Sequence, residues 1–234
     1  SGEIHGAFCL SEPEAGSDAT SQKTTAIDMG DYYLVNGTKN WITNGNTASV
    51  YIVIAQTHVE KKSKGINALI MTKDMAGFAI GPKEHKMGIR GSDTHSLMFT
   101  DVKVPKENRI GEDGFGFKFA MKTLAGGRIG IASQALGIAS GAYELALKYS
   151  KERKAFGKTI SSFQNTRFKL AELRTEIDFC RAYLDRCMQL QLEESLGIDA
   201  AAAAKYKISE MFSKVVDECL QLHGGYGYML EYPI

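Results

Sequence analysis

The feature that most constrains this chain is an abrupt change in hydrophobic periodicity near Gly114. Before this residue, aromatic and β-branched residues occur in short runs bounded by turn residues, which is typical of strands. After it, apolar residues recur every three or four positions, which is typical of helices. No helical segment separates the short runs, so a parallel sheet of βαβ units is disfavoured. The sequence therefore predicts an α+β protein, with an antiparallel β-sandwich or barrel over residues 1–113 and an incomplete antiparallel four-helix bundle over residues 114–234.

Residue types predict the individual strands and turns of the first domain. Aromatic and β-branched residues predict strands at residues 7–10, 32–35, 40–43, 49–55, 66–71 and 96–99. Gly, Asn, Asp and Pro predict turns at residues 29–31, 36–37, 44–46 and 81–82.

Three long helices are expected in the second domain. The first covers residues 115–150, and its glycines are costly unless a neighbour packs closely against them. The second carries an apolar seam from Phe163 to Cys187, and we expect residues 161–162 to cap its start and Gly197 its end. The third begins at Asp199 and stops at residues 224–225. A fourth helix is expected either beyond the end of the chain or from another subunit.

Composition excludes several classes of function. The 28 basic and 27 acidic residues give a net charge of +1, so no overall charge excess draws the chain to nucleic acid or to an anionic membrane. No apolar run approaches the roughly 18 residues of a membrane span, and the start of the chain lacks a signal-peptide pattern.

An initiator Met is also absent, and we expect a piece of a longer chain. The 4 cysteines form no C-x-x-C pair, which favours buried, reduced thiols in an intracellular protein that is not secreted.

Two clusters in the first domain suit a polar ligand. In residues 8–18 (Phe-Cys-Leu-Ser-Glu-Pro-Glu-Ala-Gly-Ser-Asp), a strand runs into a loop, and the backbone N–H groups around Gly16 and Ser17 could bind an anion, although such a loop can also be an ordinary turn. In residues 41–45 (Trp-Ile-Thr-Asn-Gly), Trp41 and Thr43 would face one side of a strand and could hold a planar heterocycle. The alternative, a tryptophan of the hydrophobic core, stays open.

Two further clusters lie in the helical domain. Residues 153–157 (Arg-Lys-Ala-Phe-Gly), placed at the end of the first helix, could clamp a phosphate and an adenine-type ring or could simply complement the helix dipole. Residues 221–228 contain Gly224 and Gly225, more glycine than a helix cap needs, so a ligand could approach the backbone there.

Several common motifs are absent from the sequence. There is no dinucleotide-binding G-x-G-x-x-G between a strand and a helix, no phosphate-binding G-x-x-x-x-G-K-[ST], no G-x-S-x-G and no H-E-x-x-H. The 5 histidines show no ligand spacing, so we predict no metal site.

All four clusters, in this order, resemble the acyl-CoA dehydrogenase family over essentially the whole chain. Residues 128–137 (Arg-Ile-Gly-Ile-Ala-Ser-Gln-Ala-Leu-Gly) resemble most closely the short-chain, butyryl-type branch. The family fold has an N-terminal helical domain, a middle β domain and a C-terminal four-helix bundle. The resemblance covers the middle domain (residues 1–113) and most of the bundle (residues 114–234), and we expect the N-terminal helical domain to be missing from this chain.

The resemblance implies FAD as cofactor and acyl-CoA as substrate. It implies that Phe8, Leu10 and Ser11 lie along the flavin edge, that Trp41 flanks the ring and that Thr43 bonds near N5. Gly16 and Ser17 would lie by the pyrophosphate, and Ser17 would also touch the CoA moiety of the substrate. The adenosine end would be held by a neighbouring subunit through two stretches, Arg153, Phe156 and Gln164 in one and Gln221, Gly224 and Gly225 in the other.

The resemblance also implies an activity, α,β-dehydrogenation of acyl-CoA thioesters in fatty-acid β-oxidation, by a homotetramer that passes electrons to an electron-transferring flavoprotein. The catalytic base is expected beyond Ile234, because Gly127 occupies the alternative position used in some branches. Glu12 and Glu14 lie near the flavin loop, but we expect them to be surface charges. The location would be the bacterial cytoplasm or the mitochondrial matrix. Two alternatives remain, a flavin-dependent oxidase and a catalytically inactive scaffold member of the same family.

Overall fold

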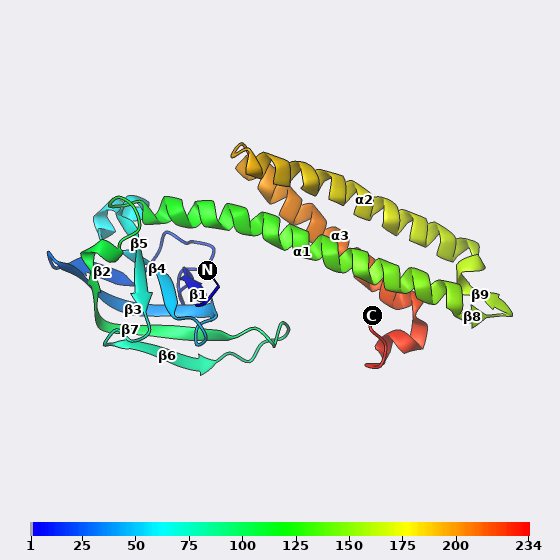
Figure 1. The fold of residues 1–234 in the computed structure, drawn as a ribbon, viewed down its shortest axis with the longest axis horizontal. Coiled ribbons are helices and arrows are strands. Elements are labelled where there is room, and N and C mark those ends of the chain that lie inside the picture. The colour runs from blue at the N-terminus through cyan, green and yellow to red at the C-terminus, as the bar shows by residue number, and fades with distance from the viewer. Residues whose placement is uncertain (1) are drawn as a thin grey trace. The chain divides into compact units, whose positions relative to one another are not determined.

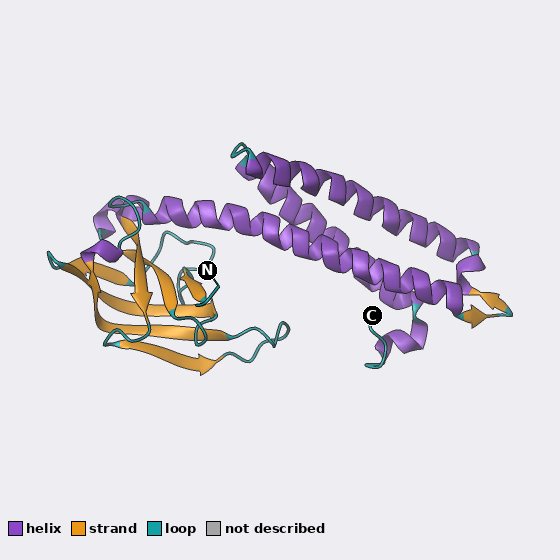
Figure 2. Cartoon of the chain, viewed as in Figure 1, coloured by secondary structure: helices purple, strands orange, loops and turns teal. Residues whose placement is uncertain are grey.

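The computed structural model describes residues 2–234. The chain divides into two compact units, Ser1–Lys122 and Thr123–Ile234. The first unit holds a β-sheet and the second is helical, as Figure 2 shows by colour. The predicted class, a β domain followed by antiparallel helices, is confirmed.

Seven strands form the sheet of the first unit (Figure 1). Their order is β1-β4-β2-β3-β7-β6, and β5 pairs with the other edge of β4. The strands are β1 (Gly6–Cys9), β2 (Thr25–Asp28), β3 (Tyr32–Thr43), β4 (Val50–Gln56), β5 (Ile66–Thr72), β6 (Phe78–Lys83) and β7 (Thr94–Pro105).

The sheet is mixed, so the prediction of a purely antiparallel sheet was wrong. β4 pairs in parallel with β1 and, through Thr25 and Gln56, with β2, whereas the remaining pairs are antiparallel. Parallel neighbours need a long crossover connection. Here the chain between β1 and β4 contains the β2–β3 hairpin, which provides that crossover without a helix.

Two predicted turns lie inside strands instead. Asn36-Gly37 belongs to β3, where the pairing with β7 shifts register between Val35 and Gly37. Gly37 has a φ of 148°, and a Cβ there would lie 2.5 Å from Thr24 Oγ1, so glycine allows this close approach. Gly81-Pro82 belongs to β6, which the sequence analysis missed together with β2.

The first unit has a core on each face of the sheet. One core includes Tyr33, Val35, Tyr51 and Leu97. The other includes Leu10, Ile54, Ile66 and Ala68, together with apolar residues from the start of α1 (Gly116–Glu152). β4 is buried on both faces in its second half, which explains its continuous apolar sequence.

The second unit contains most of α1, then α2 (Gln164–Leu192) and α3 (Ile198–Leu222). Short connections make consecutive helices antiparallel (Figure 1). The predicted seam is confirmed, since Leu170, Leu173, Ile177, Cys180, Leu184 and Cys187 are buried. Within residues 2–234, no helix has the length and apolarity that a membrane crossing requires.

Several predicted details of the helices were wrong. Ser161-Ser162 lies in a short 3₁₀ helix (Ile160–Ser162) and caps nothing, because Phe163 holds the N-cap position of α2. Gly197 is the N-cap of α3, since α2 already ends at Leu192. The glycines of α1 differ: a Cβ at Gly116 would lie 2.3 Å from the Asn67 backbone, whereas one at Gly126, Gly127 or Gly130 would meet nothing within 4 Å.

The cysteines behave as predicted buried thiols. Cys9, Cys180, Cys187 and Cys219 are all free and buried. Burial raises the pKa of Cys9 to about 12 and that of Cys219 to about 11, so these two thiols stay protonated near neutral pH.

Candidate functional site

The loop that follows β1 carries the first predicted motif. Leu10 is buried and Ser11 half-buried, whereas Gly16 and Ser17 are exposed. Phe8, within β1, is half-buried. The N–H groups of Gly16 and Ser17 donate no hydrogen bond within residues 2–234. They therefore remain available to an anion, as the predicted nest requires.

The end of β3 carries the second motif on an irregular stretch of strand. The pairing with β7 shifts register between Lys39 and Ile42, and Trp41 has a φ of 57°, an uncommon value for a bulky residue. Ile42 points into the core, while Trp41 is 59% exposed and Thr43 is also exposed. Trp41 and Thr43 therefore share an open face, and the core-tryptophan interpretation is excluded.

The structure brings these two motifs together. The N–H of Asn40 donates to the carbonyl of Ser11 over 2.9 Å, which places the loop beside the strand that carries Trp41. The Asn44 side chain donates to the carbonyl of Gly6 over 3.2 Å. The loop and the exposed strand end thus form one candidate site on the sheet.

The turn after Thr43 is held by Asp93, which the sequence analysis did not single out. Its Oδ2 accepts hydrogen bonds from the N–H groups of Asn46 at 2.9 Å and Thr47 at 3.0 Å. Its Oδ1 lies 2.8 Å from His95 Nε2. Asp93 therefore holds the turn at the end of β3 as well.

A buried ion pair underlies the loop. The Lys39 ammonium lies 2.7 Å from Glu12 Oε1, and the two residues are 0% and 1% exposed. Lys39 Nζ also donates to Gln22 Oε1 at 2.5 Å and to the Leu10 carbonyl at 3.1 Å. The expectation that Glu12 is a surface charge is wrong, because the structure places its carboxylate inside the fold. Glu14, treated in the same way, is exposed.

Burial and pairing act against each other on the pKa values of this pair. Burial lowers the pKa of Lys39 to about 8, against the attraction of Glu12, which favours the charged ammonium. Burial alone raises the pKa of Glu12, but Lys39 and the hydrogen bonds from Lys23 and Thr24 outweigh it and hold the pKa below its usual value. Both side chains are therefore charged at neutral pH.

The third motif follows α1 rather than ending it, contrary to prediction. α1 stops at Glu152, and a small hairpin of β8 (Lys154–Ala155) and β9 (Lys158–Thr159) follows. Its two-residue loop, Phe156-Gly157, has φ values of 52° and 79°. Two positive φ values are the pattern of a type I′ turn. This turn holds the Phe156 ring in solvent, 95% exposed.

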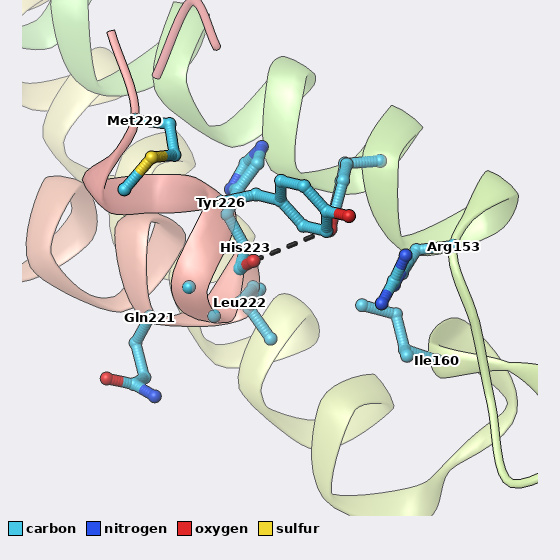
Figure 3. Close-up of a pocket in the computed structure, with 10 residues that line it drawn as sticks. Arg153, Ile160, Gln221, Leu222, His223, Tyr226 and Met229 are labelled. Carbon is cyan, nitrogen blue, oxygen red and sulfur yellow. Dashed lines mark hydrogen bonds between the residues drawn. The ribbon is translucent and has the colours of Figure 1, made fainter. Parts of the chain in front are cut away.

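A hollow of about 540 Å³ joins the third motif to the fourth (Figure 3). It lies in the second unit, where Arg153 follows α1 and residues 221–226 end α3 and enter the next short helix. Of the predicted residues, it is lined by Arg153, Gln221, Gly224 and Gly225. The resemblance implies that these two distant stretches hold the same adenosine group, and the structure places residues of both around one hollow.

Aromatic residues give the hollow its walls. The Arg153 guanidinium lies 5.1 Å from the centre of the Tyr226 ring. Tyr149 stacks on His223 with ring centres 4.3 Å apart, and its hydroxyl donates to the His223 carbonyl over 3.4 Å, the dashed line of Figure 3. His223 is buried, and its Nδ1 lies 2.9 Å from the Cys219 carbonyl.

Two predicted residues do not line this hollow. Phe156 contacts Phe163 edge-on, with ring centres 6.2 Å apart, and Gln164 is an exposed first residue of α2.

The glycines of the fourth motif differ in the space around them. A Cβ at Gly224 or Gly225 would meet nothing within 4 Å, whereas one at Gly227 would lie 2.7 Å from the Leu220 carbonyl. Gly227 is thus required by internal packing, and Gly225 is open to an external group.

The residues present fit the parts of a flavin nucleotide. The exposed Trp41 ring and Thr43 hydroxyl suit a planar heterocycle, and the unpaired N–H groups of Gly16 and Ser17 suit a pyrophosphate. Arg153 and the exposed backbone at Gly225 suit a phosphate or an adenine-type group. No group of three or more potential metal-ligating side chains occurs in residues 2–234, so the described residues offer no evident metal site.

Comparison with known families gives two matches that together span most of the chain. Residues 7–102 match the acyl-CoA dehydrogenase middle domain, and residues 114–234 match the acyl-CoA dehydrogenase C-terminal domain. The chain belongs to the acyl-CoA dehydrogenase family. The resemblance inferred from the four motifs is therefore confirmed.

Individual relatives agree with this assignment. The short-chain-specific acyl-CoA dehydrogenase of Megasphaera elsdenii is 48% identical over 98% of this chain and 60% of its own length. The solved structure of butyryl-CoA dehydrogenase from the same organism superposes with a TM-score of 0.95, 47% identity, and the same two coverages. The CarC subunit of the caffeyl-CoA reductase–Etf complex of Acetobacterium woodii is 44% identical over 97% of this chain and 60% of its own.

A glutaryl-CoA dehydrogenase from Mycobacterium smegmatis, solved in complex with FADH2, is 30% identical with a TM-score of 0.89, covering 98% of this chain and 58% of its own. The chain thus spans about 60% of the length of the relatives it matches.

The residues that sequence reasoning missed are mostly buried and polar. Lys39 could have been found, because Tyr33, Val35 and Lys39 follow a period of two along one strand, and the first two are core residues. Glu12 gave no such signal, since it lies in an irregular loop between Ser11 and Pro13.

Proposed function

We propose that the intact protein is an FAD-dependent acyl-CoA dehydrogenase acting on short acyl-CoA thioesters. The observation that carries this proposal is the exposed pair Trp41 and Thr43 on one strand face, joined to the Ser11 loop by the bond from Asn40. When bound, FAD supplies the two-electron acceptor. An exposed tryptophan in a left-handed backbone conformation is costly for folding alone, which supports a role in binding.

We assign the ring end of FAD to the first unit. Phe8, Leu10 and Ser11 would border the ring, Trp41 would cover one face of it, and the Thr43 hydroxyl would bond to a ring nitrogen. Gly16 and Ser17 would bind the pyrophosphate through their free N–H groups, with Ser17 also touching the CoA moiety.

The adenosine end would be held by the second unit of a neighbouring subunit. The hollow formed by Arg153, Gln221, Gly224 and Gly225 supports this assignment, and the exposed Phe156 and Gln164 would join from its margin. The proposal therefore requires an oligomer, for which a homotetramer is the state expected from the family. We place the domain boundary at residues 113–114, where the C-terminal family match begins.

We propose that none of the carboxylates described here is the catalytic base. Glu12 is held in the buried ion pair, and position 127, which the catalytic acid occupies in some branches, is a glycine. The acid that removes the α-proton would come from another part of the intact protein. The physiological electron acceptor would be an electron-transferring flavoprotein, as the name of the related Etf-complex subunit suggests. The location would be a bacterial cytoplasm or a mitochondrial matrix.

A second candidate is the reverse direction, reduction of an α,β-unsaturated acyl-CoA. It is favoured by the 44% identity to a caffeyl-CoA reductase subunit, which is close to the 48% found for the dehydrogenase of M. elsdenii. The oxidase alternative would require direct reaction with oxygen, and the scaffold alternative would require no flavin at all.

The decisive experiment uses the intact protein purified with FAD. We expect a yellow protein that oxidises butyryl-CoA with an artificial electron acceptor and with an electron-transferring flavoprotein, and that consumes little oxygen. Reduction of crotonyl-CoA by reduced electron donors tests the reverse direction. A colourless protein without affinity for FAD would overturn the proposal, and rapid oxygen consumption would favour the oxidase.

A further inference from the structure

The buried Glu12–Lys39 pair ties the two parts of the candidate flavin site together without lying on its surface. An ammonium has three N–H donors, and Lys39 directs them to Glu12 Oε1, Gln22 Oε1 and the Leu10 carbonyl. All three acceptors belong to the segment from Leu10 to Gln22, while Lys39 belongs to β3. One side chain therefore connects the strand to both ends of the loop.

The carboxylate extends the same network to the backbone. Glu12 Oε2 accepts hydrogen bonds from the N–H groups of Lys23 at 2.6 Å and Thr24 at 3.2 Å. The backbone of Glu12 exchanges two hydrogen bonds with Ala15, at 3.0 and 3.2 Å, which closes the turn directly before Gly16. The exposed residues 16–18 thus lie between two buried residues of this network, Ala15 and Gln22.

The same lysine lies at the irregularity that exposes Trp41. The pairing of β3 with β7 breaks its register after Lys39 and resumes at Ile42, so the bulge begins where the ammonium is anchored. Lys39 is fully buried, whereas Trp41, two residues later, is 59% exposed. An anchored Lys39 consequently favours the outward position of the indole.

Stability alone is a poor reason for this arrangement. Replacing a buried ion pair by apolar residues of similar volume is often neutral or stabilising. A network that satisfies its donors and acceptors does, however, fix geometry closely.

We propose that Glu12 and Lys39 are positioning residues for the flavin site, holding the Gly16–Ser17 loop and the Trp41 indole in the arrangement that binds the cofactor. This inference rests on the proposed function. Neither side chain touches the cofactor, because both are enclosed by the fold.

The test separates positioning from stability by replacing both partners at once. In the intact protein, Glu12→Gln with Lys39→Met removes both charges, roughly keeps the volume and leaves an amide oxygen that can accept from the N–H groups of Lys23 and Thr24. We expect the double variant to melt near the wild-type temperature, but to bind FAD at least about tenfold more weakly, a loss of ~1.4 kcal/mol. Amide exchange of Ala15 and Ser21, whose N–H groups donate hydrogen bonds within the loop, should become faster in the apoprotein. The control Asn67→Ala removes a buried polar side chain of β5 that contacts Thr57, Asp113 and Gly114, and it should lower the melting temperature with FAD affinity unchanged.

The outcomes are distinct. FAD affinity in the double variant equal to wild type would refute the positioning role, while absence of FAD binding by the wild type would refute the proposed function itself. If the double variant does not fold, Gln22→Met carries the test, since it removes one acceptor of Lys39 and leaves the ion pair. We expect a loss of FAD affinity of about threefold for this variant, and unchanged affinity would overturn the proposal.

Discussion

On the sheet, the proposed flavin residues lie over a buried ion pair, whereas at the helix ends the proposed adenosine residues lie on the surface. Trp41 and the residue 16–18 loop are fixed by Lys39, Glu12 and Asp93, each of which makes several hydrogen bonds. The Arg153 guanidinium lies over the face of Tyr226, and Phe156 extends into solvent from a two-residue turn. The proposed flavin residues on the sheet, here called the sheet side, are therefore preorganised within one chain. The proposed adenosine residues at the helix ends, here called the helix side, depend on a neighbouring molecule for further contacts.

The same contrast appears in two ion pairs of identical length. Lys39–Glu12 and Lys169–Glu218 both have N–O distances of 2.7 Å, but the second pair is 29% and 28% exposed in its side chains. We expect Lys39→Met to lower the free energy of unfolding by about 3–5 kcal/mol, because it leaves the Glu12 carboxylate buried and uncompensated. Lys169→Met should cost about 1 kcal/mol or less. Urea denaturation measures both, and equal losses would show that burial is not what distinguishes the two regions.

Acid titration tests the sheet side in a second way. Because the pKa of Glu12 is lower in the folded state than in the unfolded chain, its carboxylate contributes stability that is present above the unfolded pKa, about 4.3, and is lost as pH falls through the folded pKa. We expect the stability advantage of wild type over Glu12→Gln to shrink as pH falls from 5 towards 3. The effect should be smaller than that of Lys39→Met, because glutamine keeps a hydrogen-bond acceptor. An advantage that stays constant with pH would mean that Glu12 is not ionised in the fold.

These two regions also differ in how far the sequence could predict them. Periodicity was sufficient for the fold class, for β4, β5 and the apolar seam of α2, because those patterns reflect burial directly. It failed for the parallel pairing of β1 with β4, which depends on the path of the chain, and at Asn36-Gly37, where a close approach to Thr24 makes glycine part of a strand. In the candidate site, the exposed residues were found through motifs, whereas Glu12 and Gln22 were missed because no local pattern shows that a charged loop turns inward.

Replacing Trp41, on the sheet side, allows the effect on FAD affinity to be compared with the effect on the free energy of unfolding. Trp41→Ala should lower the affinity of the intact protein for FAD by about tenfold, since an aromatic contact is worth ~1.5 kcal/mol at most beyond its buried area. The free energy of unfolding should change by about 0.5 kcal/mol or less, because the indole is 59% exposed. Trp41→Phe keeps an aromatic face and serves as the matched control. Flavin absorbance measures the affinity for FAD, and equilibrium denaturation measures the free energy of unfolding. A large loss of stability in Trp41→Ala would show that Trp41 has a structural role.

Phe156 provides the corresponding test on the helix side. Its replacement is expected to raise the free energy of unfolding but to lower the affinity for FAD. Its φ of 52° is followed by 79° at Gly157, a turn that prefers Asn-Gly, and the exposed ring gains little from its edge contact with Phe163. Phe156→Asn should therefore raise the free energy of unfolding by about 0.5–1 kcal/mol, since asparagine tolerates the left-handed region better than a bulky residue. If the ring contacts the nucleotide of a neighbouring subunit, the same variant should lose FAD affinity in the oligomer. Gly157→Ala is the control, because it strains the turn at a φ of 79° while leaving the ring in place. A Phe156→Asn protein that is both less stable and unchanged in FAD affinity would show that the ring serves its own chain, and the contrast between a self-contained sheet side and a partner-dependent helix side would fail at this residue.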